Sequence, residues 1–274
     1  MLVTRIAPTP SGYLHAGNAV NFLLTAWLAR QHGGRLLLRI DDMDSTRVRV
    51  PYLEDVFRVL EWLDIRIDAG PSGVAEFQRD YSLVHRTGVY RDAVAAMRSA
   101  GVHVYACRCS RRDLANHAAG FYPGTCRNAG LAHVPGETAL RVALDRPTPV
   151  DVAGEILDVA GVLGDFVIWR RDDVPAYQLA SVVEDRDLAV NAVVRGRDLL
   201  ASTGAQLALA PWVGAHEFAG ADFRHHALLT GADGAKLSKS AGSGGSSIVG
   251  DARLREEILS AAVALAPTVG VVSP

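Results

Sequence analysis

The first forty residues alternate between short apolar runs and a stretch with helical periodicity. The apolar run at 2–6 is followed by a loop rich in proline and glycine, which predicts a strand that ends in a turn. From Asn18 onward apolar side chains recur on one helical face, and the pattern stops at the glycine pair 33–34. A second apolar run at 35–40 predicts a buried strand. This order of strand, loop, helix and strand predicts a doubly wound, parallel α/β sheet.

Further along the chain the pattern changes character. Residues 53–63 and 90–97 carry apolar side chains at helical spacing, and each stretch predicts a helix. The stretch 102–171 holds all the cysteines, many turn residues and short β-like runs. We therefore predict a catalytic α/β domain made of 1–101 and 172–230, interrupted by an inserted module at 102–171.

The α/β pattern resumes after this module. It is seen again in residues 177–183 and in the apolar run 188–194. The spacing of apolar side chains at 199–212 predicts a helix. The last segment, 231–274, begins with a loop that becomes rich in glycine and serine. It continues into a short helix, for which Asp251 is the expected N-cap.

Composition and charge narrow the class of protein. The chain has 274 residues, of which 49% are hydrophobic, enough for a sizeable core. The net charge is −2, so any contact with nucleic acid must come from local basic patches. No apolar run approaches the roughly 18 residues of a membrane helix, and the N-terminus does not resemble a signal peptide. Three cysteines within one short stretch argue against a disulfide framework, so we expect a cytoplasmic protein.

The loop after the first strand carries the first candidate chemistry. His15, Gly17 and Asn18 stand where the loop enters the helix, and backbone N–H groups at a helix start attract phosphate. His15 can donate a hydrogen bond to a phosphate whose charge grows during displacement. Gly17 keeps side-chain bulk away from a bound nucleotide. We expect an ATP-binding site here.

A second candidate element lies near the C-terminus. Lys236, Ser238 and Lys239 belong to the run Lys-Leu-Ser-Lys-Ser ahead of the glycine- and serine-rich loop. Two lysines three residues apart, with serines between them, form a cationic clamp for a polyphosphate. Lysine–serine loops are common, and it is the combination with the N-terminal motif that points to a nucleotide site.

These two elements resemble the "HIGH" and "KMSKS" motifs of class I aminoacyl-tRNA synthetases. Within that class the chain is most similar to glutamyl-tRNA synthetases, through the motifs at 5–12, 39–44 and 194–199, and the similarity runs from residue 3 to about residue 240. The resemblance implies the Rossmann-type sheet of class I synthetases. It also implies activation of an amino acid by ATP and Mg²⁺, with His15 and Lys239 stabilising the developing charge.

The same resemblance implies an acidic amino acid as substrate. Arg5 and Arg195 are the expected anchors, because arginine binds both oxygens of a carboxylate. Tyr177 is expected to donate a hydroxyl hydrogen bond, and Asp41 to face the ammonium group of L-glutamate. The family usually has glutamate where Asp41 stands, so either a water molecule fills the gap or the amino acid differs. The remaining residues expected around glutamate are Ile6, Ala7, Pro8 and Thr9.

The cysteines predict a metal site. Cys107, Cys109 and Cys126 offer three thiolates for a tetrahedral zinc ion. Resemblance to the glutamyl-Q tRNA(Asp) synthetases, which share the C-x-C and Y-x3-C pattern, makes Tyr122 the fourth ligand, and His117 is the conventional alternative. No acid–base pair surrounds the cluster, so we expect one structural zinc ion per chain.

Only 34 residues follow Ser240 (274 − 240), too few for an anticodon-binding domain. The glutamyl-Q tRNA(Asp) synthetases also lack that domain, and they attach activated glutamate to queuosine in the anticodon loop of tRNA(Asp). We expect the same reaction here, carried out by a monomer. Two alternatives remain: a similar ligase that uses another acceptor or amino acid, or a non-catalytic RNA-binding paralogue.

Overall fold

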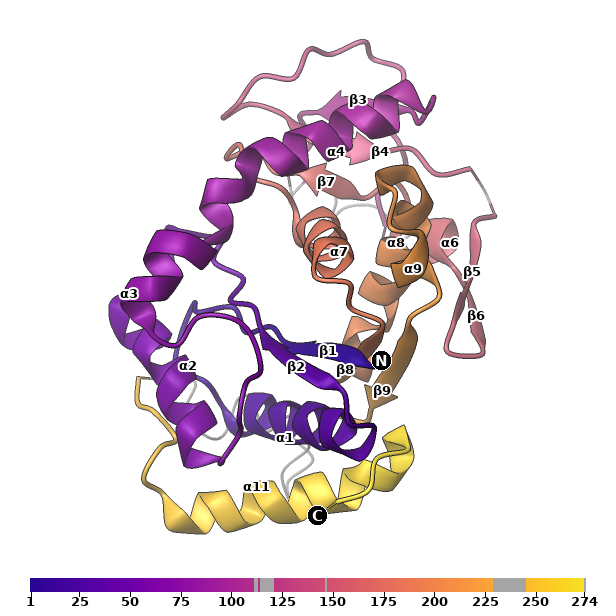
Figure 1. Cartoon of the computed structure of the whole chain (residues 1–274). Helices are drawn as coiled ribbons and strands as arrows, with labels where there is room; N and C mark the ends of the chain where they lie inside the picture. The colour runs from indigo at the N-terminus through magenta and orange to yellow at the C-terminus, as the bar shows by residue number, and fades with distance from the viewer. Residues whose placement is uncertain (111–112, 114–120, 146, 229–244, 274) are drawn as a thin grey trace. The chain divides into compact units, whose positions relative to one another are not determined.

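The protein is described from a computed structural model, shown in Figure 1. The structure describes residues 1–110, 113, 121–145, 147–228 and 245–273. The chain forms two compact units. The first unit contains residues 1–85, 190–198 and 222–274, and the second contains 86–189 and 199–221.

The first unit is built around parallel strands. β1 (Val3–Ile6) pairs with β2 (Arg35–Leu38), and β8 (Ala192–Gly196) pairs with β9 (Asp222–His226), both in parallel. Three of these four strands are buried along most of their length, as expected for a sheet covered by helices.

Asn191 joins the two parallel pairs. Its backbone N–H donates to the carbonyl of Val3 at 3.0 Å, and its side-chain oxygen accepts from the Val3 N–H at 2.8 Å. β1 and β8 are therefore neighbours. Within each pair the strands are parallel, so their carboxyl ends lie at the same edge of that pair, which is where α/β sheets bind ligands.

Helix α1 (Ala16–Gln31) forms the core of the first unit. It is apolar on nearly all sides, as is typical of a helix that is buried rather than amphipathic. One side packs on β1, β2 and β8, and another packs on α11 (Ala252–Leu265), as Figure 1 shows. The predicted N-cap of α11 is confirmed, because the Asp251 carboxylate accepts a hydrogen bond from Leu254 N at 3.0 Å.

The remaining helices of the first unit surround this core. They are α2 (Val50–Trp62), α3 (Val74–Glu76), the π-helix η1 (Phe77–Tyr81) and the 3-10 helix η5 (Ala266–Val269). The 3-10 helices η2 (Leu83–Arg86) and η3 (Arg197–Leu199) stand where the chain passes from one unit to the other.

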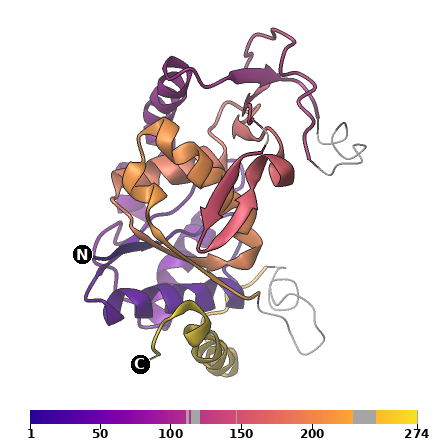
Figure 2. The same ribbon diagram turned by 90° about the vertical axis from the view of Figure 1, so that its right-hand side faces the viewer.

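The second unit contains antiparallel strands. β4 (Ala139–Val142) lies between β3 (Val104–Cys107) and β7 (Val167–Trp169). β5 (Pro149–Val152) and β6 (Glu155–Asp158) form a hairpin, visible in Figure 2. Its two turn residues, 153–154, both have positive φ, which matches the twist of a two-residue hairpin.

Helices complete the second unit. They are α4 (Thr87–Ser99), α6 (Val159–Leu163), α7 (Tyr177–Asp187), α8 (Leu200–Leu209), the 3-10 helix η4 (Ala210–Val213) and α9 (His216–Ala219). A buried carboxylate links two of them, because Glu184 on α7 accepts hydrogen bonds from Tyr90 Oη at 2.8 Å and from Arg86 Nε at 2.6 Å.

The predicted helices at 53–63, 90–97 and 199–212 are confirmed in kind and approximate extent. The division into a catalytic domain and an insertion at 102–171 stays a prediction. Within the described part of the chain, no helix combines the length and the apolar character that a bilayer crossing requires.

Candidate functional site

His15 caps helix α1 through its side chain. Its Nδ1 accepts a hydrogen bond from the backbone N–H of Asn18 at 3.3 Å, and the Asn18 side-chain oxygen accepts from His15 N at 3.1 Å. This reciprocal arrangement is a capping box. Because Nδ1 is an acceptor, the proton of the neutral ring lies on Nε2. The other side of the imidazole is thus a hydrogen-bond donor, held at a helix start that favours anions.

Gly17 makes room for this ring. A Cβ atom at residue 17 would stand 3.0 Å from both Cε1 and Nδ1 of His15. That is closer than side chains normally pack, so a substitution would push the imidazole away from the helix. The glycine therefore supports the position of His15, besides the role near a nucleotide that the sequence suggests.

Two buried arginines lie on the neighbouring strands of the first unit. Arg5 on β1 is 6% exposed and Arg195 on β8 is 4% exposed. The Arg195 guanidinium lies over the ring of Phe223 on β9, 5.1 Å from the ring centroid. Burying cations is costly unless anions or hydrogen-bond acceptors lie close by. The two guanidinium groups bring two positive charges to adjacent strands of this unit.

His225 is a neighbour of Arg195 that sequence reasoning missed. The two residues are register partners on β8 and β9. Burial, together with the positive charges of Arg195 and Arg197, lowers the pKa of His225 to about 4. The imidazole is therefore neutral at pH 7, and the positive charge here comes from arginine. No signal marked this residue, because the polar sequence of β9 did not predict a strand.

From the lowered pKa of His225 we predict that the folded protein loses stability in mild acid. The pKa of His225 in the folded protein, about 4, lies below the ordinary value of 6.5, so folding favours the neutral form. The unfolded chain binds the proton first, and stability present above pH 6.5 is lost as the pH falls toward 4. We expect urea unfolding to give a lower free energy of unfolding at pH 5 than at pH 7.5. His225→Asn should reduce this difference. His216→Asn, on the exposed face of α9, is the control; an unchanged difference in His225→Asn would contradict the assignment.

Asp41 is held by Arg39 in a bidentate ion pair. Arg39 Nε lies 2.6 Å from Asp41 Oδ1, and Arg39 Nη2 lies 3.0 Å from Asp41 Oδ2. The backbone N–H of Asp41 donates to the carbonyl of Pro8 at 2.8 Å. The carboxylate expected to face an ammonium group is therefore oriented by a guanidinium and placed beside the loop that follows β1.

Asp42 stabilises the segment after β2 through hydrogen bonds made by its buried carboxylate. Its carboxylate is buried and accepts hydrogen bonds from Ser82 Oγ and from Leu83 N, the latter at 2.8 Å. Burial is the main cause of a raised pKa at Asp42, and the hydrogen bonds partly oppose it. The residue thus ties the chain after β2 to the segment before α4.

The other predicted site residues fall in three places. Ile6 ends β1, and Ala7, Pro8 and Thr9 follow it in the loop. Tyr177 begins α7 in the second unit, with 39% of its surface exposed. Lys236, Ser238, Lys239 and the alternative ligand His117 lie outside the described residues.

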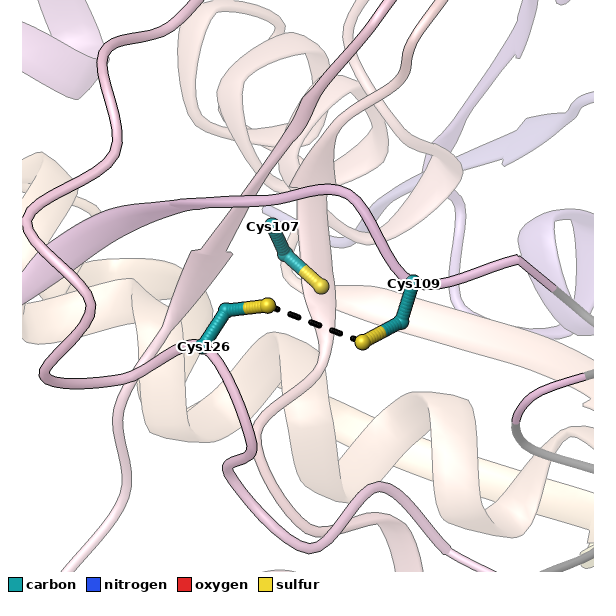
Figure 3. Close-up of side chains that lie close together, drawn as sticks. All are labelled: Cys107, Cys109 and Cys126. Atoms are coloured by element: carbon teal, nitrogen blue, oxygen red, sulfur yellow. Dashed lines mark hydrogen bonds between the residues drawn. The ribbon is translucent and has the colours of Figure 1, made fainter.

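The structure brings the three cysteines together. The Sγ atoms of Cys107, Cys109 and Cys126 lie within 4.8 Å of one another and converge on one point (Figure 3). Cys109 Sγ and Cys126 Sγ are 3.6 Å apart. Tyr122 Oη lies 3.3 Å from Cys107 Sγ and 3.9 Å from Cys109 Sγ.

These separations fit a tetrahedral metal. Zinc–sulfur bonds of about 2.3 Å and a zinc–oxygen bond of about 2.0 Å place two sulfurs about 3.8 Å apart, and sulfur and oxygen about 3.5 Å apart. Tyr122 is buried, and its oxygen accepts a hydrogen bond from Cys126 N at 2.8 Å, as a ligand oxygen can. Burial raises the pKa of the Cys109 thiol to about 11.

Arg141 packs against the ring of this tyrosine. Its guanidinium carbon lies 3.8 Å from the centroid of the Tyr122 ring, and its Nη1 donates to the carbonyl of Asp165 at 2.7 Å. Asp165 also accepts from Tyr105 Oη at 2.6 Å and from Arg127 Nε at 2.8 Å. A polar network centred on Asp165 therefore holds Arg141 against the tyrosine ring.

Comparison with known proteins shows the family of this chain. The family described as tRNA synthetases class I (E and Q), catalytic domain, matches residues 1–265. The glutamyl-Q tRNA(Asp) synthetase of Symbiobacterium thermophilum is 42% identical over 258 residues, covering 87% of this chain and 78% of that protein. The corresponding protein of Ectopseudomonas mendocina is 40% identical over 243 residues, covering 87% and 77%.

A solved structure has a similar fold. The crystal structure of glutamate-tRNA synthetase from Elizabethkingia anophelis superimposes with a TM-score of 0.70 at 24% identity, covering 87% of this chain. This chain spans about half the length of that protein, 52%. The chain therefore belongs to the class I tRNA synthetases of the E and Q type and is a ligase enzyme with the catalytic fold of that class.

Proposed function

We propose that the chain activates L-glutamate with ATP as glutamyl-adenylate and transfers the glutamyl group to queuosine in the anticodon loop of tRNA(Asp). The observation that carries this proposal is the placement of two buried arginines, Arg5 and Arg195, on neighbouring strands. β1, which bears one of them, leads directly into the loop and helix capped by His15. The names of relatives at 42% and 40% identity support the glutamyl group and the tRNA acceptor.

In the first step an oxygen of the glutamate α-carboxylate attacks the α-phosphorus of ATP. The bond from this phosphorus to the bridging oxygen breaks, and pyrophosphate leaves with the electron pair. His15 donates from Nε2 to the phosphate oxygens as their charge increases, and the N-terminus of α1 favours the same charge. Lys239 stabilises the transition state, and Lys236 and Ser238 hold the polyphosphate. Mg²⁺, when bound, neutralises phosphate charge during the displacement.

Glutamate is oriented by charge. Arg5 and Arg195 bind its carboxylates, since a guanidinium contacts both oxygens of a carboxylate. Asp41 faces the ammonium group, and Arg39 keeps the Asp41 carboxylate in one orientation through its two hydrogen bonds. Tyr177 contributes a hydroxyl hydrogen bond. The adenylate is formed because the reacting atoms are positioned, so no covalent enzyme intermediate is required.

In the second step a hydroxyl of the cyclopentene-diol attacks the adenylate carbonyl. The carbon–oxygen bond to AMP breaks, AMP leaves with the electron pair and the hydroxyl proton is released, so the products are the glutamyl ester, AMP and a proton. A zinc ion held by Cys107, Cys109, Tyr122 and Cys126 has a structural role in this proposal. The enzyme works as a cytoplasmic monomer.

Activation is tested without tRNA. We expect the purified protein to exchange labelled pyrophosphate into ATP when glutamate is present, because adenylate formation is reversible. Lys239→Ala should lower this exchange by about 10²-fold or more, as loss of a transition-state charge contact does. Wild-type protein that shows no exchange with glutamate, glutamine or aspartate would remove the ligase proposal.

The acceptor needs a separate measurement. Labelled glutamate should be transferred to tRNA(Asp) that carries queuosine and not to the same tRNA without it. Equal labelling of both would exclude queuosine as the determinant.

Asp41 favours a second candidate, a ligase of the same build with another amino acid. Its side chain is one methylene shorter than the glutamate usual at that place, and Arg39 already binds both of its oxygens. Exchange rates across a panel of amino acids decide between the two. A higher rate with an amino acid other than glutamate would favour the second candidate.

A further inference from the structure

Helix α2 contacts the loop that presents His15 at two successive residues. The Asp55 carboxylate accepts a hydrogen bond from the backbone N–H of Leu14 at 2.9 Å, and Leu14 immediately precedes His15. The ring of Tyr52 meets the ring of Tyr13 edge to face, with centroids 5.1 Å apart and planes at 79°. The backbone on the N-terminal side of His15 is therefore fixed from outside its own helix.

The two α2 residues act from one face of the helix. Tyr52 and Asp55 are three residues apart, and side chains at that spacing are neighbours on a helix surface. Their partners, Tyr13 and Leu14, are consecutive in the loop. A turn of α2 thus contacts the loop on one side of His15, and Asn18 contacts His15 on the other.

Asp55 is an unusual residue for this position. It is fully buried, at 0% exposure, on a helix whose buried neighbours Val56 and Val59 belong to the apolar core. Its Oδ1 is buried and has no hydrogen-bond partner among the described residues. A carboxylate in such surroundings is costly, and an apolar residue would pack there at less cost. In return for this cost, the buried carboxylate forms the hydrogen bond with Leu14 N.

We propose that Asp55 is a positioning residue for adenylate formation, which acts by holding the Leu14 backbone so that the His15 imidazole faces the phosphate. Tyr52 supports it through the ring of Tyr13. The inference rests on the proposed function and deepens it, since it assigns part of the placement of His15 to a helix outside the sequence motif. Small displacements of a catalytic group reduce rates strongly even when every contact to the substrate is retained.

The test compares three substitutions on one turn of α2. Asp55→Ala removes the acceptor, Asp55→Asn keeps an oxygen that can accept from Leu14 N, and Glu54→Ala alters the adjacent exposed residue. We expect Asp55→Ala to lower kcat for glutamate-dependent ATP–pyrophosphate exchange by about 10- to 100-fold, with KM for glutamate changed by less than about threefold. Asp55→Asn should restore most of the rate, and Glu54→Ala should match wild type.

A structural measurement makes the test independent of activity. Hydrogen exchange at the Leu14 amide, read by mass spectrometry or NMR, should be faster in Asp55→Ala and near the wild-type rate in Asp55→Asn. Unchanged exchange or an unchanged kcat in Asp55→Ala would overturn the inference. An equal loss of kcat in the Asn variant would do the same, because it would assign the effect to charge and not to the hydrogen bond.

A further measurement is needed if Asp55→Ala does not fold or if the wild-type protein is inactive. If Asp55→Ala does not fold, Tyr52→Leu replaces it, with Tyr52→Phe as the control that keeps the ring. A lower kcat in the Leu variant alone supports the inference, and equal rates in both variants overturn it. Wild-type protein without exchange activity would defeat the proposed function, whereas the Leu14 amide would still report whether Asp55 holds the loop.

Discussion

Replacing His15 by asparagine should lower kcat for adenylate formation by about 10²- to 10³-fold while the protein keeps its stability. The histidine has two functions that asparagine separates. Its Nδ1 caps α1, and its Nε2 is the donor that we assign to the phosphate. Asparagine is among the best N-cap residues, so the helix start is retained, but its shorter side chain has no donor at the position of Nε2. The measurements are ATP–pyrophosphate exchange and urea unfolding of the same preparations.

His15→Ala provides the comparison, because it removes both functions. It should lose the same catalytic factor and also about 1 kcal/mol of unfolding free energy, the usual cost of an absent cap. His32→Asn, at the C-terminal end of the same helix, is the matched control and should leave kcat unchanged. If the asparagine variant keeps the wild-type kcat, the imidazole is not the donor and its role is confined to the helix.

The sequence predicts those parts of the fold that depend on local patterns. The helix beginning near Asn18 follows from apolar spacing, and the structure extends it to Ala16. The cap at Asp251 follows from the preference of aspartate for that position. The convergence of Cys107, Cys109 and Cys126 is predicted from metal-ligand spacing, and the structure confirms that the three side chains meet.

Other features depend on partners that are distant in the sequence. Asp42 binds the segment at 82–83, and Asp55 binds Leu14, about forty residues away in each case. An aspartate at a buried helical position cannot be distinguished by pattern from one at a solvated position. β9 was missed because its sequence is mostly polar, and its strand conformation depends on pairing with β8.

The bidentate ion pair of Arg39 and Asp41 is a contact between residues close in the sequence that sequence patterns also did not predict. The two residues alternate around Ile40, which places both side chains on one side of an extended segment. The sequence motif marked Asp41 as a partner for an ammonium group and gave Arg39 no separate role. In the structure Arg39 is 4% exposed and contacts both oxygens of the carboxylate. The orientation of Asp41 is therefore set by an internal cation before any substrate binds.

Removing Cys126 or the Tyr122 hydroxyl should weaken zinc binding. We expect about one zinc ion per chain in the wild type, the ordinary content of a structural site. Cys126→Ser and Tyr122→Phe should each reduce zinc affinity by on the order of a hundredfold, because each leaves three ligands of four. The reason is geometric, since Tyr122 Oη lies 3.3 Å from Cys107 Sγ and Cys109 Sγ lies 3.6 Å from Cys126 Sγ. Competition with a chromophoric chelator measures the affinity, and metal analysis measures the content.

Tyr90→Phe is the matched control, because it removes a buried hydroxyl from the same unit. That hydroxyl donates to Glu184 and is not one of the expected ligands, so zinc content should remain at the wild-type level. The substitution Tyr122→Phe also retains the ring on which Arg141 packs, which confines the change to the oxygen atom. If Tyr122→Phe keeps its zinc and His117→Ala loses it, histidine is the fourth ligand. If neither single change affects the metal, the three cysteines bind it with a ligand from outside the chain, such as water, and the site is open to exchange.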